Sequence, residues 1–108
     1  KNRKTLNLWS TKVTDKGLEN LKGLEDLQDL SLQGTAVTDK GLESLKGMTK
    51  LNRLNLYGTK VTDEGVDSLK EMKGLTSVDL QQTKVTNDGL KALAKAKPNL
   101  FINPMPKK

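Results

Sequence analysis

Short stretches of alternating hydrophobic and polar residues recur along the chain, and each is followed by a pattern of longer period. Leu6 and Leu8 flank one polar residue, and the same arrangement returns three more times. Alternation at a period of two predicts a short strand with one buried face. Apolar residues then fall at Leu18, Leu21 and Leu24, a spacing that predicts about two turns of helix. Each unit is therefore expected to contain a strand, a turn, a short helix and a return.

The units repeat with a period of 24 residues and without a gap. They span residues 6–29, 30–53, 54–77 and 78–101. Residues 102–108 begin a fifth unit that stops early, and they are expected to form a partial fifth strand and a C-terminal cap. A regular internal repeat of this length is typical of solenoid proteins. Residues 1–108 are therefore interpreted as one solenoid domain.

Neighbouring units must stack, because neither a short strand nor a short helix can bury its apolar face alone. Successive strands then lie parallel and are joined by right-handed crossovers. The helical side of such a stack is the wider side, so the strands should line the concave face and the helices the convex face. Met48 and Met72 take the column of Leu24, and all three are expected in the core. The predicted fold is a right-handed α/β solenoid.

One polar column holds a threonine in every unit. Its members are Thr11, Thr35, Thr59 and Thr83. We expect each hydroxyl to turn inward and to bond the backbone of a turn in its own or the adjacent coil. A nucleophilic threonine would need a base beside it, and the chain contains no histidine.

A second polar column lies at the predicted helix starts. It holds Asp15, Asp39 and Asp63, and Asn87 takes the position in the fourth unit. Three stacked carboxylates are a candidate Ca²⁺ site, but an asparagine weakens such a site and caps a helix as well as aspartate does. We therefore expect each aspartate to cap or complement its own helix, with Thr14 or Asp15 as the first N-cap.

A glycine also stands early in every predicted helix. The four are Gly17, Gly41, Gly65 and Gly89. Glycine inside a helix costs about 0.5–1 kcal/mol relative to alanine, so four copies indicate a local need. Close approach of the backbone to the next coil is the expected reason. Phosphate binding is the rival explanation, and it lacks the glycine-rich loop that such sites use.

Composition and charge exclude several classes of protein. Only 33% of the residues are hydrophobic, which a thin, one-layer solenoid tolerates better than a thick core. The chain has no cysteine and no histidine, which removes the usual zinc ligand sets and imidazole bases, and no cofactor is implied. The net charge of +6 comes from the two ends, since acids and bases nearly balance over residues 6–90. Nucleic acid is therefore not the expected partner, no apolar run predicts a membrane span, and localisation cannot be inferred.

Residues 27–45 follow the pattern L-x-x-L-x-L-x-x-T-x-V-T-D-x-G-L-x-x-L, and residues 51–69 repeat it with one valine for leucine. This pattern resembles the leucine-rich repeat. It is most similar to the subclass of bacterial repeat proteins and is related to the cysteine-containing repeats of F-box proteins. Threonine stands where most leucine-rich repeats have asparagine or cysteine. The resemblance implies the solenoid fold, and because the motif residues are structural it says little about function.

Residues that flank the buried pair of each strand face the concave side in this fold, and they vary from unit to unit. The candidates for partner contact are Trp9, Gln33, Tyr57, Gln81, Arg53, Asp29, Asn55 and Asp79. Aromatic residues and arginine are enriched in binding hot spots, so Trp9, Tyr57 and Arg53 lead this set. The alternative is structural: an aromatic can serve cross-strand packing, and Trp9 can cover the open end of the first unit.

The two ends of the array are expected to differ. The edge at Leu6 is expected to be open, which predicts self-association, further repeats or an appended domain. At the other end Phe101, Ile102 and Met105 are expected to fold back over the last coil, and either Asn99 or Leu100 occupies the column of Leu75.

The favoured function is a non-catalytic module that binds a protein or peptide on its concave sheet. The alternatives are a spacer or scaffold fragment of a larger repeat protein, or an engineered consensus-like repeat without a ligand. An enzyme is not expected, because no histidine or cluster of acids supports one.

Overall fold

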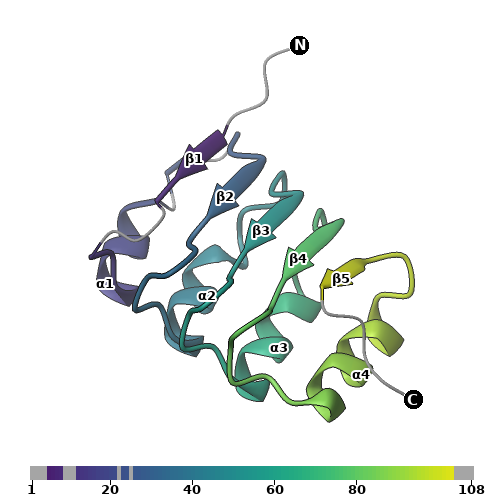
Figure 1. Ribbon diagram of the computed structural model, residues 1–108. Coiled ribbons are helices and arrows are strands. Elements are labelled where there is room, and N and C mark those ends of the chain that lie inside the picture. The colour runs from purple at the N-terminus through teal and green to yellow at the C-terminus, as the bar shows by residue number, and fades with distance from the viewer. Residues whose placement is uncertain (1–4, 9–11, 22, 25, 104–108) are drawn as a thin grey trace.

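A computed structural model of the chain describes residues 5–8, 12–21, 23–24 and 26–103. Strands and helices alternate along the chain, as Figure 1 shows. The elements are, in order, β1 (Thr5–Asn7), α1 (Asp15–Leu18), the 3₁₀ helix η1 (Glu19–Leu21), β2 (Asp29–Ser31), α2 (Asp39–Leu45), β3 (Arg53–Asn55), α3 (Asp63–Lys70), β4 (Ser77–Asp79), α4 (Asn87–Ala96) and β5 (Phe101–Asn103). Within the described residues, no helix is long and apolar enough to cross a membrane.

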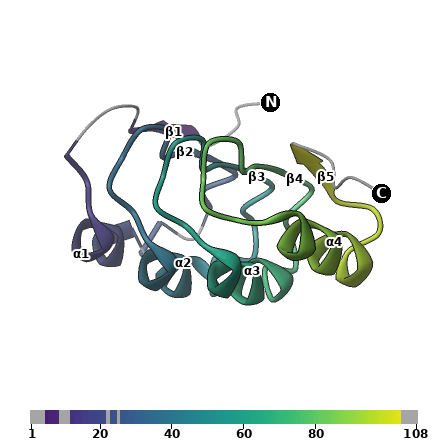
Figure 2. The ribbon, with the colours of Figure 1, turned by 60° about the horizontal axis from the view of Figure 1, so that its bottom comes forward.

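The five strands form one open parallel sheet in the order β1-β2-β3-β4-β5. Each strand pairs with the next at an offset of one repeat, so that Asp29 lies opposite Arg53 and Arg53 opposite Ser77. The helices form a second layer behind the sheet, and their row is longer than the row of strands (Figure 2). The sheet is therefore the inner, concave face, and the predicted α/β solenoid is confirmed.

The core lies between the sheet and the helices and is built from the predicted apolar columns. Leucines of the inner coils such as Leu32, Leu45 and Leu56 are fully buried, and Met48 and Met72 are buried as expected. Leu24 is the exception in its column, since 46% of its surface is exposed. The expectation that Leu24 fills the core is wrong, because among the described residues no coil covers the outer side of the first unit.

The threonine column lies where it was expected. The Thr35, Thr59 and Thr83 hydroxyls donate to the carbonyls of Leu32, Leu56 and Leu80 at 2.8, 2.8 and 2.6 Å. Each bond closes the turn that follows the strand of the same coil, and Thr35 and Thr59 are buried. Thr11 falls outside the described residues.

The aspartate column joins neighbouring coils, a role that was not predicted. Asp15, Asp39 and Asp63 do not cap their own helices, but each lies in the first turn of its helix and complements it, as the other half of the prediction has it. The Asp39 carboxylate accepts from Thr62 N at 2.7 Å and from Thr62 Oγ1 at 2.5 Å, one coil further on. Asp15 accepts the same two bonds from Thr38, and Asp63 accepts them from Thr86. The threonines themselves are the N-caps of α1 to α4. Stacking brings each cap within reach of the preceding aspartate, which a single unit cannot reveal.

The glycine column provides the space for these bonds. A Cβ at Gly41 would lie 2.5 Å from Asp15 Oδ1, and a Cβ at Gly65 would lie 2.5 Å from Asp39 Oδ1. Such distances are far inside van der Waals contact, so only glycine admits the carboxylate of the preceding coil. A close approach of the backbone to another coil is confirmed at these positions, but the expectation that it is the next coil is wrong. The coil that is approached is the preceding one.

At the C-terminal end the chain shifts by one residue relative to the repeat. Leu100 is buried and takes the place of Leu75, while Asn99 is exposed. Ile102 is buried within β5, where it lies opposite Val78. Phe101 does not fold back over the last coil as expected, because the sheet register turns its side chain to the concave face, where 61% of it is exposed. Met105 lies outside the described residues.

Candidate functional site

The concave face is built from strand residues that alternate with the buried ones. Because the strands pair in register, these side chains form columns that run across the sheet. One column contains Thr5, Asp29, Arg53, Ser77 and Phe101. The second contains Asn7, Ser31, Asn55, Asp79 and Asn103. Gln33, Tyr57 and Gln81 follow at equivalent positions just beyond three of the strands.

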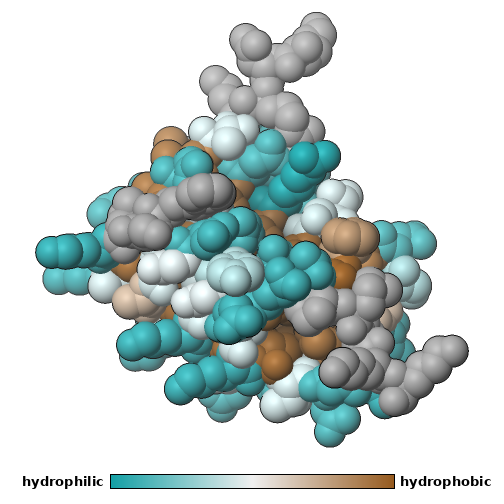
Figure 3. Space-filling view, in the orientation of Figure 1, coloured by the Kyte–Doolittle hydropathy of each residue, from teal (hydrophilic) through white to brown (hydrophobic). Residues whose placement is uncertain are grey.

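A shallow groove of about 380 Å³ runs between the first two columns. Its lining includes four predicted contact residues, namely Asp29, Arg53, Asn55 and Asp79. The surface over the strands is largely hydrophilic with smaller hydrophobic areas between, as Figure 3 shows. The groove therefore offers polar and charged side chains from neighbouring strands to one bound segment.

Some of these side chains also stabilise the scaffold. Asn55 Oδ1 accepts from Tyr57 N at 3.0 Å, and its Nδ2 donates to Gln33 Oε1 at 3.2 Å. Asp79 Oδ1 accepts from Gln81 N at 3.0 Å. These bonds hold the chain where it leaves β3 and β4 and position the half-buried side chains of Tyr57 and Gln81. Asn55 and Asp79 thus orient the surface in addition to lining it.

Arg53 is the most available charged group of the groove. Its side chain is exposed and makes no ion pair or side-chain hydrogen bond within the described part of the chain. Asp29 lies opposite it in the sheet register and accepts from Thr5 Oγ1 at 3.2 Å. A guanidinium offers five donors in a planar fork, which suits a carboxylate or a backbone carbonyl of a bound segment.

The structure places most of the predicted contact residues on one surface and does not describe the rest. Gln33, Tyr57 and Gln81 share the end of the sheet beyond the strands, whereas Trp9 lies outside the described residues. Phe101 was missed as a concave residue because its place at the end of the last repeat suggested a cap. The 24-residue spacing was the available signal, since it aligns Phe101 with Arg53 and Ser77. A strongly exposed aromatic side chain therefore joins the candidate surface.

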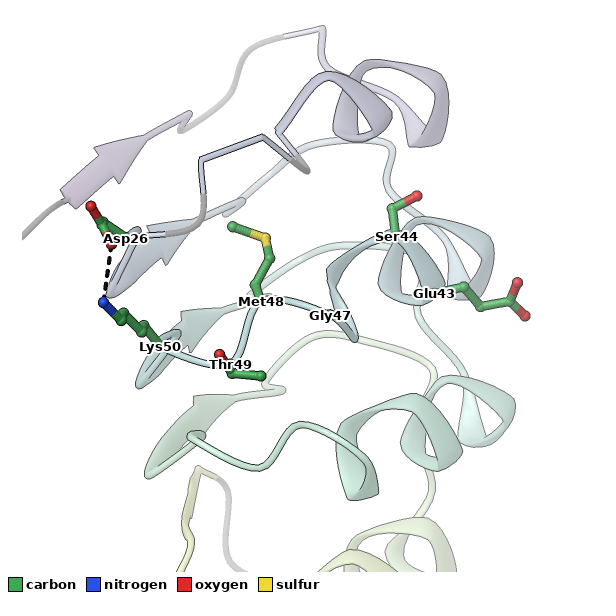
Figure 4. Close-up of a pocket in the computed structure, with 7 residues that line it drawn as sticks. All are labelled: Asp26, Glu43, Ser44, Gly47, Met48, Thr49 and Lys50. Atoms are coloured by element: carbon green, nitrogen blue, oxygen red, sulfur yellow. Dashed lines mark hydrogen bonds and ion pairs between the residues drawn. The ribbon is translucent and has the colours of Figure 1, made fainter.

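A second hollow, of about 590 Å³, lies between the return segments of the first two coils. Figure 4 shows Asp26 and Lys50 bonded at one end, with Ser44 and Glu43 apart from them on α2. The side chains do not converge on one point, so the hollow has no arrangement for acid–base chemistry. No group of three acidic, histidine or cysteine side chains that could hold a metal occurs among the described residues.

Comparison with known proteins identifies the repeat. A family model described as Leucine Rich repeat matches residues 24–46, 47–70 and 75–94, which together make up more than half of the chain. A search of curated proteins found no match.

Proposed function

Because the chain belongs to the leucine-rich-repeat family, we propose that it is a non-catalytic module that binds a protein or peptide in the groove of its concave sheet. Leucine-rich repeats are in general protein-binding modules. The partner lies across the strands and contacts Arg53, Tyr57 and Phe101 first.

One observation carries this proposal, namely the contrast between repeated and varied columns. The columns that fill the core or join the coils hold nearly the same residue in every unit, whereas the concave column that runs from Thr5 to Phe101 holds a different residue at every strand. Structural need explains the first group. Asn55 and Asp79 of the concave columns also hold the chain, as described above. The concave face further contains Arg53, Tyr57 and Phe101, which are residue types enriched in protein interfaces.

The charges of the groove favour a protein over a nucleic acid. Two carboxylates, Asp29 and Asp79, stand beside the single guanidinium of Arg53. A phosphate backbone would meet more repulsion than attraction on this surface. A polypeptide can present both signs of charge together with an apolar side chain for Phe101.

The proposal is tested by selecting peptides from a random phage-displayed library on the immobilised chain. Peptides that bind should lose at least about tenfold in affinity when Arg53, Tyr57 and Phe101 are all replaced by alanine, since hot-spot truncations typically cost 1–2 kcal/mol each. A convex-face control with Glu43→Ala and Lys91→Ala should bind unchanged. Peptides that bind the triple variant as well as the parent would contradict the proposal. A library that yields no binder would favour a spacer role.

A further inference from the structure

Arg53 and Phe101 are the two largest side chains of one concave column, which crosses the five strands as Thr5, Asp29, Arg53, Ser77 and Phe101. The Arg53 side chain is exposed and forms no ion pair or hydrogen bond within the described part of the chain. Phe101 is 61% exposed. Only β4 lies between β3 and β5 (Figure 1). A cation and an apolar ring therefore face the same partner, with the small side chain of Ser77 between them.

The charges around Arg53 favour one carboxylate over a more highly charged anion. Asp29 and Asp79 lie on the two neighbouring strands, and neither forms an ion pair with Arg53. Both carboxylates bond other groups, since Thr5 Oγ1 donates to Asp29 at 3.2 Å and Gln81 N donates to Asp79 at 3.0 Å. A single carboxylate fits the guanidinium fork, whereas a phosphate with nearly two charges would be repelled by both aspartates.

The groove beside this column is wide enough for one extended chain. It has a volume of about 380 Å³ and lies between the column of Arg53 and the column of Asn55. These columns are two residues apart along each strand, which is about 6.6 Å. An α-helix with its side chains is about 10–12 Å across and is too wide to enter. The shape of the groove therefore favours an extended peptide.

Backbone hydrogen bonding favours the polyproline II conformation over a β-strand for that peptide. The N–H and C=O groups of the strands bond the neighbouring strands within the sheet. A peptide that lies on the face of the sheet cannot add to this ladder, so a β-strand conformation would gain no backbone bonds there. Polyproline II makes no internal hydrogen bonds and keeps its backbone groups in water. It therefore loses nothing by lying on side chains alone.

The distance between the two contacts favours the same conformation. Arg53 and Phe101 are two strand separations apart, which places their Cα atoms about 9.6 Å from each other. Polyproline II has three residues per turn and rises 3.1 Å per residue, so residues i and i+3 point the same way about 9.3 Å apart. Side chains on one face of a β-strand are about 6.7 or 13.3 Å apart, and neither distance matches.

We propose that the groove binds peptides in the polyproline II conformation that carry a carboxylate and an apolar side chain three residues apart. The carboxylate accepts hydrogen bonds from the Arg53 guanidinium, and the apolar side chain packs against Phe101. The peptide backbone between them passes over Ser77. This inference rests on the proposed function, because it specifies the partner of the same surface.

The peptides selected from the random library provide the first test. Most of the binders should contain an aspartate or glutamate three residues from an aliphatic or aromatic residue, in either order along the peptide. Binders in which this spacing is no commoner than in the starting library would overturn this proposal and leave the proposed function standing. A library that yields no binder would count against both.

A double-mutant cycle with a selected peptide tests the two contacts by calorimetry. Arg53→Gln in the chain, or the amide in place of the acidic residue in the peptide, should each weaken binding about tenfold, and both together should weaken it no further. Phe101→Ala should couple in the same way to alanine at the apolar residue. Lys91→Gln removes an exposed charge from α4 and is the matched control, which should bind unchanged. Losses that multiply within the Arg53 cycle would overturn the proposal.

Changes between the two peptide residues test the conformation. Proline at both intervening positions should keep the affinity within about threefold, because proline already favours polyproline II. One glycine added to or removed from the interval should weaken binding about tenfold or more, because residues i and i+3 then no longer point the same way. Loss of binding with the two prolines would overturn the proposal. Equal binding at a spacing of two or four residues would identify a β-strand and overturn it too.

Discussion

The first and third coils carry the same apolar columns, yet they bury them to different degrees. Leu54, Leu56 and Leu69 are buried in the third coil. Their equivalents Leu6, Leu8 and Leu21 are only half-buried in the first. The third coil has a neighbour on each side, and the first has one on the C-terminal side among the described residues. In a solenoid the contribution of a residue to stability therefore depends on its position in the stack as much as on its identity.

The largest expected effect comes from removing a leucine at equivalent positions of the two coils. Leu54→Ala should lower the free energy of unfolding by about 3 kcal/mol, because it leaves a cavity in a fully packed site. Leu6→Ala should cost about 1 kcal/mol, since much of that side chain already faces water. Urea unfolding followed by circular dichroism measures both, and equal costs would show that the first coil is as well covered as the third.

Replacing glycine by alanine should change the free energy of unfolding in opposite directions in the third and first coils. Gly65→Ala should destabilise by about 2 kcal/mol, because the new methyl group overlaps the Asp39 carboxylate and Leu42. Gly17→Ala should stabilise by about 0.5 kcal/mol, because the new methyl group would lie at an ordinary contact distance, 3.5 Å, from Val13 Cγ1 and alanine favours a helix. Thermal unfolding of the two variants beside the parent is the measurement. A loss of stability in Gly17→Ala would contradict the expected difference between the two coils.

The threonine caps of the third and first coils should contribute differently to the free energy of unfolding. Thr62→Val removes the hydroxyl bond to Asp39 and the cap bond from Glu64 N, and should cost about 1.5 kcal/mol. Thr14→Val should change the free energy of unfolding by less than about 0.5 kcal/mol, since the Thr14 side chain makes no cap bond. Valine has nearly the shape of threonine, so packing is matched in the pair. Equal losses would contradict the idea that the inner caps owe their strength to the preceding aspartate.

The smallest expected effect extends the comparison to the turn of the fourth coil. Gln82 has a φ of 60°, and the equivalent residues of the two coils before it are Gly34 and Gly58, with φ of 74° and 72°. Gln82→Gly should stabilise by about 1 kcal/mol, because glycine adopts this left-handed conformation without strain. Gly58→Gln should cost a similar amount and serves as the control. A destabilised Gln82→Gly would show that the glutamine side chain makes a compensating contact.

The 24-residue repeat was sufficient to predict the strands, the helices, the parallel sheet and the face on which each apolar column lies. The threonine column could also be predicted, because its bond to a carbonyl three residues earlier is local. The bonding partner of each aspartate could not be predicted from the sequence. Asp39 and Thr62 are 23 residues apart, and which coil receives the carboxylate depends on how two coils are offset when they stack.

The candidate binding surface was likewise predicted only in part from the sequence. Arg53 and Asp29 were predicted to share the concave face, because strand alternation alone assigns them to it. Phe101 was missed, although the 24-residue spacing aligns it with Arg53 and Ser77, because its place at the end of the last repeat suggested a cap. The pairing of β5 with β4 places it on the concave face.

The amino-acid sequence by itself determined the architecture, because a period of 24 residues allows one way to bury every apolar column at once. The tertiary structure alone decided which polar groups meet between coils and how far each leucine is covered. Those properties arise from the stacking of one unit on another. A unit that repeats almost unchanged in sequence therefore differs along the stack in burial, in hydrogen bonding and in what it can bind.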